Sequence, residues 1–280
     1  MKSSLKNFVK NFLTSLVYKS GKTRGGGYLC EQIINTVMNQ VVDVEHKRLK
    51  LRFAVPNSVN RFRVNTFSTK EPETLEWIDG FPNGAILWDI GANVGLYSIY
   101  AAKARQCDVY AFEPSVFNLE LLARNAYLNG LTDQICLVPL ALTDKLTRSK
   151  LNMTTTEWGG ALSTFGQDFG WDGKIMKKSF VFQTMGLSMT DAKNILNFPQ
   201  PDYIKMDVDG IEHFILRGGR EVLQKIKGIL VEISDDFPEQ ATESRMILQE
   251  AGLIMKEKAH SEMVERSEFY NTYNQIWYRV

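Results

Sequence analysis

The chain has 280 residues, enough for one large α/β domain or for a domain of roughly 200 residues with an appendage. Its formal net charge of +1 creates no overall field that would attract nucleic acid, so we expect no nucleic-acid partner. The three cysteines lack C-x-x-C spacing, and no apolar run of about 18 residues predicts a membrane span, so we expect a cytoplasmic protein.

Residues 1–19 are predicted to form an amphipathic helix. Its apolar residues recur at i, i+3, i+4 spacing, with lysines among the polar positions: Leu5, Phe8, Val9, Phe12, Leu13, Leu16 and Val17. No small-residue cleavage site follows, which argues against a signal peptide. The pattern fits a helix that packs on its own domain or on a second copy in a homo-oligomer. The alternative is a basic helix lying on a membrane surface, which would make the protein peripheral at the membrane.

Residues 1–80 are predicted to form an accessory region that also holds a second helix and a hairpin. The glycine-rich residues 21–27 predict a break, and a second helix is expected near residues 28–40. Apolar and charged residues alternate across residues 49–67 around Pro56-Asn57, which predicts a hairpin. A further helix is expected to start near Pro72, with Thr69 as its cap.

The most informative stretch is a strand, a glycine turn and a helix start at residues 86–105. The strand carries Asp89 near its end, and Gly91 and Gly95 frame the turn that follows. Such a turn brings backbone N–H groups close to a ligand at a helix N-terminus. The next strand, at residues 108–112, is followed by Glu113, and an acid at this position can accept from both hydroxyls of a ribose. We therefore predict a ligand of the nucleoside type.

The same turn argues against two common classes of nucleotide. A dinucleotide site needs a second glycine where this chain has Asn93, whose side chain would crowd a pyrophosphate, so a dehydrogenase is disfavoured. No G-x-x-x-x-G-K-[ST] motif supports a nucleoside triphosphate. The remaining candidate is a nucleoside without phosphates, such as S-adenosylmethionine. Asn93 can hydrogen-bond an amino-acid head group, and Asp89 can accept from its ammonium group.

The rest of the chain continues to alternate strands and helices. Strands are expected at 135–139, 202–208, 228–233, 252–257 and 274–280, and helices at 95–105, 115–129, 188–197, 210–226 and 239–251. This alternation predicts a parallel, doubly wound sheet. No helix separates the last two strands, so we expect seven strands with the last one antiparallel. An insertion at about residues 145–187 interrupts the alternation and is expected to form a substrate loop, with a plain surface loop as the alternative.

Three ordered motifs resemble one known family. Residues 88–98, residues 111–114 and residues 205–212 are similar to the FkbM family of S-adenosylmethionine-dependent methyltransferases, and the resemblance covers about residues 70–235. It implies a class I methyltransferase (Rossmann-like) fold over residues 81–280. Asp209 departs from the family pattern, which has Glu at this position. The residues that the resemblance places around the cofactor are Asp89, Gly91, Asn93, Gly95 and Glu113, with Leu142 and Asp144 near the adenine and Glu71 a candidate for the methionine end.

The segment after the strand at 202–208 favours an oxygen acceptor. Methyltransferases acting on planar nitrogens often carry an Asn/Asp-Pro-Pro-Tyr run here, whereas this chain has Asp207-Val208-Asp209-Gly210. His213 is a candidate base for a hydroxyl, oriented by Asp207 or Asp209, although its place in a helix also fits plain packing on the sheet. Asp207 is itself a candidate base. Asp207, Asp209 and Glu232 offer oxygen ligands for Mg²⁺, but their spacing is not diagnostic and we assign no metal ligand.

The acceptor is expected to be a hydroxyl group on a saccharide. FkbM-like enzymes are associated with hydroxyls of glycans and polysaccharides and of some macrolide-type products. The insertion contributes aromatic residues that fit the C–H face of a sugar: Trp158, Phe165, Phe169 and Trp171. A macrolide-like small molecule is the alternative acceptor. A non-catalytic scaffold that only binds the cofactor is the alternative function.

Overall fold

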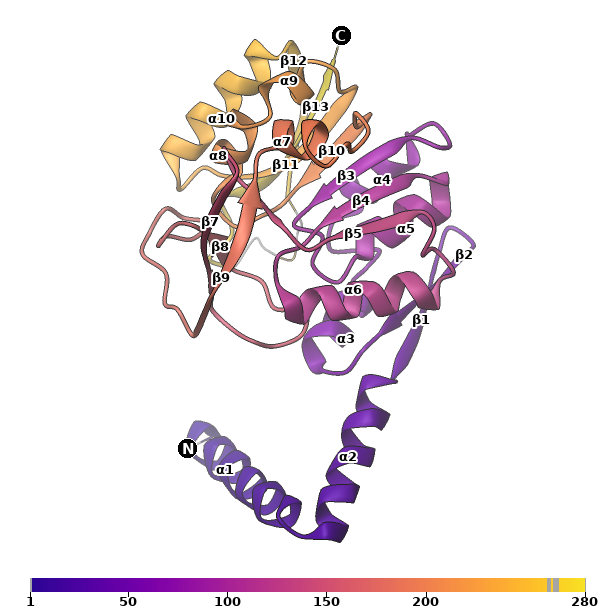
Figure 1. The fold of residues 1–280 in the computed structure, drawn as a ribbon, viewed down its shortest axis with the longest axis vertical. Coiled ribbons are helices and arrows are strands. Elements are labelled where there is room, and N and C mark those ends of the chain that lie inside the picture. Colours follow the sequence, from indigo (N-terminus) through magenta and orange to yellow (C-terminus); the bar gives the residue numbers. More distant parts are fainter. Residues whose placement is uncertain (1, 261–262, 264–266, 280) are drawn as a thin grey trace.

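The computed structural model describes residues 2–260, 263 and 267–279 and is shown in Figure 1. Met1 and Val280, the outer ends of the first predicted helix and of the last predicted strand, lie outside the described residues. The described strands form three sheets of two, seven and four strands. None of the described helices is long and apolar enough to cross a membrane.

The seven-stranded sheet is the centre of the molecule, in the order β12-β13-β11-β10-β3-β4-β5. Its parallel strands pair directly with their neighbours, and β13 is antiparallel to both β11 and β12. The predicted Rossmann-like sheet with a reversed last strand is therefore confirmed. The strand bounds are β3 (Ile86–Ile90), β4 (Asp108–Phe112), β5 (Ile135–Val138), β10 (Tyr203–Met206), β11 (Gly228–Ser234), β12 (Leu253–Ala259) and β13 (Thr272–Arg279).

Helices cover both faces of this sheet (Figure 1). Because side chains alternate along a strand, Trp88 and Ile90 enter one buried cluster and Leu87 enters the other. The predicted helix at 210–226 is instead two short helices, with Gly218 as the C-cap of the first and Gly219 as the N-cap of the second. Glycine is needed at 218, where a Cβ would lie 2.6 Å from the Thr143 carbonyl oxygen. The helix bounds are α4 (Pro72–Asp79), α5 (Leu96–Arg105), α6 (Val116–Leu128), α7 (Met189–Asn194), α8 (Glu212–Arg217), α9 (Arg220–Leu223) and α10 (Pro238–Glu250).

Two N-terminal helices, α1 (Lys2–Gly21) and α2 (Arg24–Met38), extend away from the rest of the molecule (Figure 1). The predicted glycine-rich break is shorter than expected, because the glycines at 25–27 are helical. A Cβ on Gly26 would lie 2.0 Å from the Ser20 carbonyl oxygen, so glycine permits the close approach of the two helices here. The apolar stripe of α1 is exposed, and packing of this helix on its own domain is therefore wrong.

The predicted hairpin across residues 49–67 is also wrong in its second half. The hairpin lies one strand earlier, between β1 (Val41–His46) and β2 (Leu49–Ala54), and residues 58–65 form the helix α3. Lys47 and Arg48, both at positive φ, make the two-residue turn, and the Asn57 side chain caps α3 by accepting from the Asn60 N–H. The next helix, α4, begins at Pro72 as predicted, but its N-cap is Glu71 and not Thr69.

The insertion folds as a four-stranded sheet and not as an irregular loop. Its strands are β6 (Ala141–Leu142), β7 (Thr147–Met153), β8 (Ser163–Phe165) and β9 (Phe180–Leu187), in the order β6-β9-β7-β8. Only one end of β7 is buried, and charged side chains occupy its outer part. That composition hid the strand from the sequence pattern, because a short, half-exposed strand carries little apolar alternation.

Candidate active site

The glycine turn between β3 and α5 brings the ends of two parallel strands into direct contact. Gly91 has φ +80°, and a Cβ there would lie 1.9 Å from the carbonyl oxygen of Asp207, just beyond β10. Gly95 has φ +81° and is the N-cap of α5, where a Cβ would lie 2.2 Å from Leu122 Cδ1. Both positions therefore require glycine, for the left-handed backbone and for the space.

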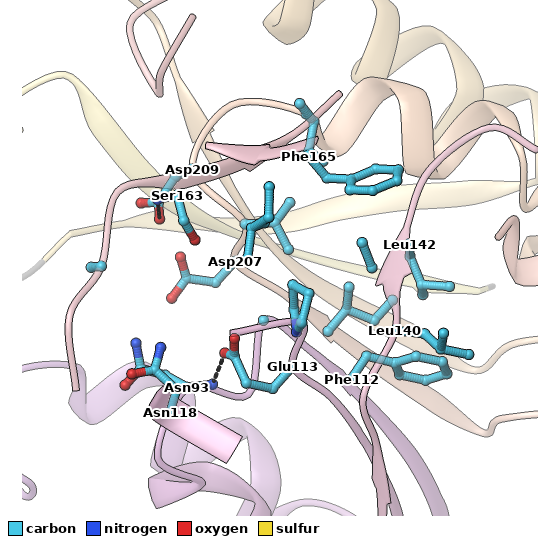
Figure 2. Close-up of a pocket in the computed structure, with 18 of the residues that line it drawn as sticks. Asn93, Phe112, Glu113, Asn118, Leu140, Leu142, Ser163, Phe165, Asp207 and Asp209 are labelled. Carbon is cyan, nitrogen blue, oxygen red and sulfur yellow. Dashed lines mark hydrogen bonds between the residues drawn. The ribbon is translucent and has the colours of Figure 1, made fainter. Parts of the chain in front are cut away.

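Glu113 is held at the tip of β4 by two backbone donors. Its carboxylate accepts from the Asn93 N–H at 2.8 Å and from the Ser115 N–H at 2.7 Å. Burial raises the pKa of Glu113 to about 7, against the lowering effect of these hydrogen bonds. The carboxylate faces a cavity, as Figure 2 shows.

This first cavity lies beyond the carboxyl ends of β3, β4 and β10. One wall is apolar and suits a flat ring, whereas the polar side chains gather near Glu113 and Asp207 (Figure 2). The apolar wall consists of Phe112, Leu140, Leu142, Phe165 and Ile211.

Residues 158–163, which we name the roof, close the cavity from the side of the insertion. Asn93 and Asn118 both donate to the Gly160 carbonyl, at 2.8 and 3.1 Å. Asp209 accepts from the N–H groups of Leu162 and Ser163, at 2.7 and 3.3 Å. The roof is therefore tied to the glycine turn, to α6 and to the loop after β10.

The helix α3 of the accessory region holds the other end of the roof. Arg63 Nε donates to the Gly159 carbonyl at 2.9 Å, and the side-chain amides of Asn57 and Asn60 donate to the Trp158 carbonyl at 2.9 and 2.7 Å. The accessory region thus contributes to the site through α3, which was not predicted, as well as through the predicted Glu71.

A second cavity adjoins the first and shares Gly91, Asn93, Asp207 and Asp209 with it. A third lies along the glycine turn. Asp207 is the one titratable side chain that lines all three of these described cavities. The second cavity is strongly charged, since its lining includes Arg63, Lys70, Glu71, Asp207, Asp209 and Glu232.

Two lysines balance part of this negative charge. Lys70 Nζ lies 2.5 Å from Glu71 Oε1, and although burial would raise the pKa of Glu71, the Lys70 and Lys205 ammonium groups lower it to about 2. Lys205 is buried with its Nζ 3.4 Å from Asp207 Oδ2. Burial would lower the pKa of Lys205, but the nearby carboxylates of Asp207, Asp89 and Glu71 raise it, so this lysine is charged.

Two further acids in the second cavity bind protons unusually tightly. Burial and the neighbouring Asp207 raise the pKa of Asp209 to about 6. Burial, together with the neighbouring Asp207 and Glu71, raises the pKa of Glu232 well above its usual value. Glu212, by contrast, lines none of the described cavities. Its buried carboxylate accepts from the N–H groups of Val208 and Gly210 and braces the loop that carries Asp209.

The structure brings most of the predicted cofactor residues together. Gly91, Asn93, Glu113 and Leu142 line the first cavity, and Glu71 lines the second and third. Asp89 is buried behind the turn, where it accepts from Ser98 Oγ at 2.5 Å and its Oδ1 has no hydrogen-bond partner among the described residues. Asp144 lines none of the described cavities and is half-buried beside Thr143.

His213 lies away from the cavities. Its ring is fully buried, with centroids 4.2 Å from Phe214 and 5.5 Å from Phe237, and neither nitrogen has a hydrogen-bond partner among the described residues. Burial lowers its pKa, so the imidazole is neutral. His213 lies away from the cavities because of its position on the helix. α8 starts at Glu212, and the next side chain, that of His213, therefore points toward α10 instead of toward the glycine turn.

The aromatic residues predicted as a sugar platform are mostly turned elsewhere. Phe165 lines the first cavity, but Trp158, Phe169 and Trp171 line none of those described. The Trp158 ring donates to Glu120 on α6, and Trp171 packs against Phe269 with centroids 4.8 Å apart. No role was predicted from the sequence for four residues at the site, namely Arg63, Lys70, Lys205 and Asn118. Three of these are charged side chains that face a cavity, and no local sequence pattern predicts that a side chain will face a cavity.

Asp207, Asp209 and Glu232 do not assemble into a metal site. Within residues 2–260, 263 and 267–279, no group of three or more His, Cys, Asp or Glu side chains converges so as to hold a metal ion.

The model of the FkbM methyltransferase domain matches residues 89–255, which contain the glycine turn, Glu113, the roof and the Asp207–Asp209 loop. The chain belongs to the FkbM methyltransferase family. This FkbM-family protein is accordingly an S-adenosylmethionine-dependent methyltransferase.

Characterised relatives of this FkbM-family methyltransferase share low identity with it. The Haloferax volcanii hexuronic acid methyltransferase AglP is 24% identical, over 65% of this chain and 70% of the relative. The Sordaria araneosa methyltransferase sdnD is 27% identical, over 55% of this chain and 68% of the relative. A ribosomal protein arginine N-methyltransferase, rmt3 of Schizosaccharomyces pombe, is 34% identical over 29% of this chain, and the match spans only 15% of that protein.

Solved structures that resemble this chain share less sequence identity with it than AglP and sdnD do. The crystal structure of M. jannaschii TYW2 in complex with AdoMet has a TM-score of 0.44 and 12% identity, covering 86% of this chain and 87% of that one. The fold assignment rests on the strand order and directions in Figure 1.

Proposed function

We propose that this methyltransferase transfers the methyl group to a hydroxyl of a saccharide. The observation that carries the proposal is the second cavity, which adjoins the first and presents four acidic side chains, those of Glu71, Asp207, Asp209 and Glu232. Carboxyl oxygens accept hydrogen bonds from hydroxyls whether or not the group is ionised, so such a wall suits a polyhydroxylated acceptor. The relative AglP, described as a hexuronic acid methyltransferase, supports a sugar.

S-adenosylmethionine fits the first and third cavities. Glu113 would accept from the ribose hydroxyls, and the apolar wall with Leu142 would hold the adenine. The amino-acid end would lie along Gly91 in the third cavity, with Lys70 and Arg63 beside it for its carboxylate. When bound, the cofactor supplies an electrophilic methyl group on a sulfonium.

We assign proton removal from the acceptor hydroxyl to Asp207. It lines all three cavities, and the buried ammonium of Lys205, 3.4 Å away, holds the carboxylate in place. Asp209 and Glu232 would orient the other hydroxyls of the acceptor. His213, buried against Phe214 and Phe237, has no role in this scheme.

Methyl transfer from labelled S-adenosylmethionine to sugar nucleotides and oligosaccharides tests the proposal, with cofactor binding measured separately by calorimetry. Asp207→Asn should lower kcat by about 10²–10⁴-fold, the usual contribution of a general base, while S-adenosylhomocysteine still binds. His213→Phe should keep turnover. A large loss of kcat in a folded His213→Phe variant would return the base to His213. Cofactor binding without transfer to any hydroxyl acceptor would favour the scaffold alternative.

A further inference from the structure

The two N-terminal helices carry an apolar surface that the described chain leaves uncovered. On α1 the exposed fractions are 66% for Leu5, 68% for Phe8 and 59% for Phe12, and they remain above half for Leu13, Leu16 and Val17. These residues follow the i, i+3, i+4 spacing of one helix face, opposite Asn7, Asn11 and Thr14. Exposed apolar residues continue on α2, at Tyr28, Leu29, Ile33 and Ile34. A contiguous apolar face of this kind marks an interaction surface.

The charge of the same segment is one-sided. Residues 1–30 contain six basic residues and no acidic residue, the first acid being Glu31. The basic residues are Lys2, Lys6, Lys10, Lys19, Lys22 and Arg24. The rest of the chain must therefore carry a net negative charge, since the whole protein has +1. The positive charge is thus concentrated on the part of the molecule that also exposes the apolar face.

We propose that α1 and α2 form a docking surface for an anionic lipid bilayer. A helix with an apolar stripe, flanking lysines and small polar residues on its other side lies in the plane of a bilayer, with its lysines reaching the anionic headgroups. The aromatic residues Phe8 and Phe12 on this stripe suit the boundary between headgroups and acyl chains. Neither helix is long and apolar enough to span, so the contact is with the surface.

Charge distinguishes this occupant from a second copy of the chain. A symmetric dimer through α1 would bring the same basic segment of each copy together, and no acid within residues 1–30 could compensate it. An anionic bilayer instead compensates every lysine.

Flotation of the full chain with vesicles tests the proposal. Binding should be strong to phosphatidylcholine vesicles containing phosphatidylglycerol, weak to pure phosphatidylcholine, and reduced by high salt. The double variant Phe8→Ser/Phe12→Ser should bind at least about tenfold more weakly, because two apolar side chains no longer enter the bilayer. Lys10→Glu/Lys19→Glu should weaken binding to the anionic vesicles by at least about tenfold, since each basic residue contributes about fivefold. Ile175→Ser, at an 89% exposed position in the insertion, is the matched control and should bind as the wild type does.

Sedimentation velocity without vesicles shows whether a second copy of the chain, instead of a bilayer, covers this surface. A chain that is monomeric and binds anionic vesicles through these residues supports the proposal. A chain that ignores vesicles overturns it, and if that chain is a dimer that Phe8→Ser/Phe12→Ser dissociates, the surface belongs to a second copy. Binding that is indifferent to both double variants also overturns it. Methyl transfer to a water-dissolved acceptor should be unchanged in all variants, which keeps this test independent of the proposed function.

Discussion

Gly91 lies where the first, second and third cavities meet, and its missing side chain is what lets β3 and β10 end side by side. Two separate costs would follow from adding a Cβ. One is the left-handed backbone, at φ +80°, and the other is the collision with the Asp207 carbonyl oxygen. Gly84 has nearly the same backbone, at φ +76°, but nothing within 4 Å of its Cβ position. Substitutions at Gly84 and Gly91 therefore distinguish the cost of the left-handed backbone from the cost of the collision.

We expect Gly84→Ala to lower the free energy of unfolding by about 1–2 kcal/mol, the cost of a left-handed L-residue. Gly91→Ala should lower it by about 3 kcal/mol or more, since overpacking adds about 1–3 kcal/mol. Urea denaturation measures both. Equal losses would mean that β3 and β10 relax around the added methyl group without cost.

Glu113 should make cofactor affinity depend on pH. Its pKa of about 7 in the folded protein lies above the usual 4.5, so the folded state holds a proton that the unfolded chain releases. This contribution to stability is present below pH 4.5 and is lost as pH rises through about 7. The affinity for the cofactor should change with pH in the opposite direction and increase as pH rises, because the ionised carboxylate is the better acceptor for the ribose hydroxyls.

The affinity for S-adenosylhomocysteine should therefore fall by up to about tenfold per unit as pH decreases from about 7 to about 6. Glu113→Gln should weaken binding and remove most of this dependence in calorimetric titrations. Asp144→Asn is the control, because Asp144 lines none of the described cavities. A loss of affinity in Asp144→Asn would instead restore the predicted contact between this residue and the adenine.

At the level of secondary-structure elements, the roof connects parts of the chain that are far apart in sequence. Residues from α3, the glycine turn, α6 and the loop after β10 all hydrogen-bond to residues 158–163. Asn118 on α6 makes two of these bonds, accepting from the Gly159 N–H at 3.0 Å and donating to the Gly160 carbonyl. The roof therefore couples the positions of these elements beside the first cavity.

Asn118→Ala should loosen the roof. The buried Gly159 N–H loses its partner and the Gly160 carbonyl loses one of its two donors, so we expect a loss of about 1–3 kcal/mol in the free energy of unfolding and faster amide exchange at residues 159–163. Hydrogen exchange with mass spectrometry measures the second effect. Tyr127→Ala on the same helix, at a 77% exposed position, should change neither quantity. Unchanged exchange in Asn118→Ala would show that the remaining anchors suffice.

Across the whole molecule, the accessory region after residue 40 shares a core with the sheet. Leu51, Phe53 and Phe67 enter the same buried cluster as Leu87 of β3 and Tyr100 of α5. The hairpin and α3 are therefore expected to unfold together with the central sheet, unlike α1 and α2, which lie outside this core.

Phe53→Ala should lower the free energy of unfolding by about 3–5 kcal/mol, as expected for a fully buried phenylalanine. The transition should remain single when followed both by tryptophan fluorescence and by circular dichroism. Phe62→Ala, at a 51% exposed position in α3, should stay within about 0.5 kcal/mol of the wild type. Two separate transitions in Phe53→Ala would indicate that the hairpin and α3 form an independent unit.

Local patterns were sufficient for the central sheet and for the cofactor turn. The apolar strands, Gly91, Asn93 and the acid after the neighbouring strand could be read from sequence because each is set by its near neighbours in the chain. Periodicity was not sufficient at residues 58–65, where an alternating pattern concealed a helix whose cap is Asn57. It also failed in the insertion, whose strands pair with each other mostly outside the core.

The residues that face the cavities depended on long-range packing. His213 and Asp209 lie four residues apart in one motif, yet α8 buries the first among aromatic rings while the second lines two cavities. Arg63 and Lys70 of the accessory region meet Glu232 of β11, far along the chain, in the second cavity. A turn is encoded by its own few residues, whereas a charged cavity exists only where separate elements fold against one another.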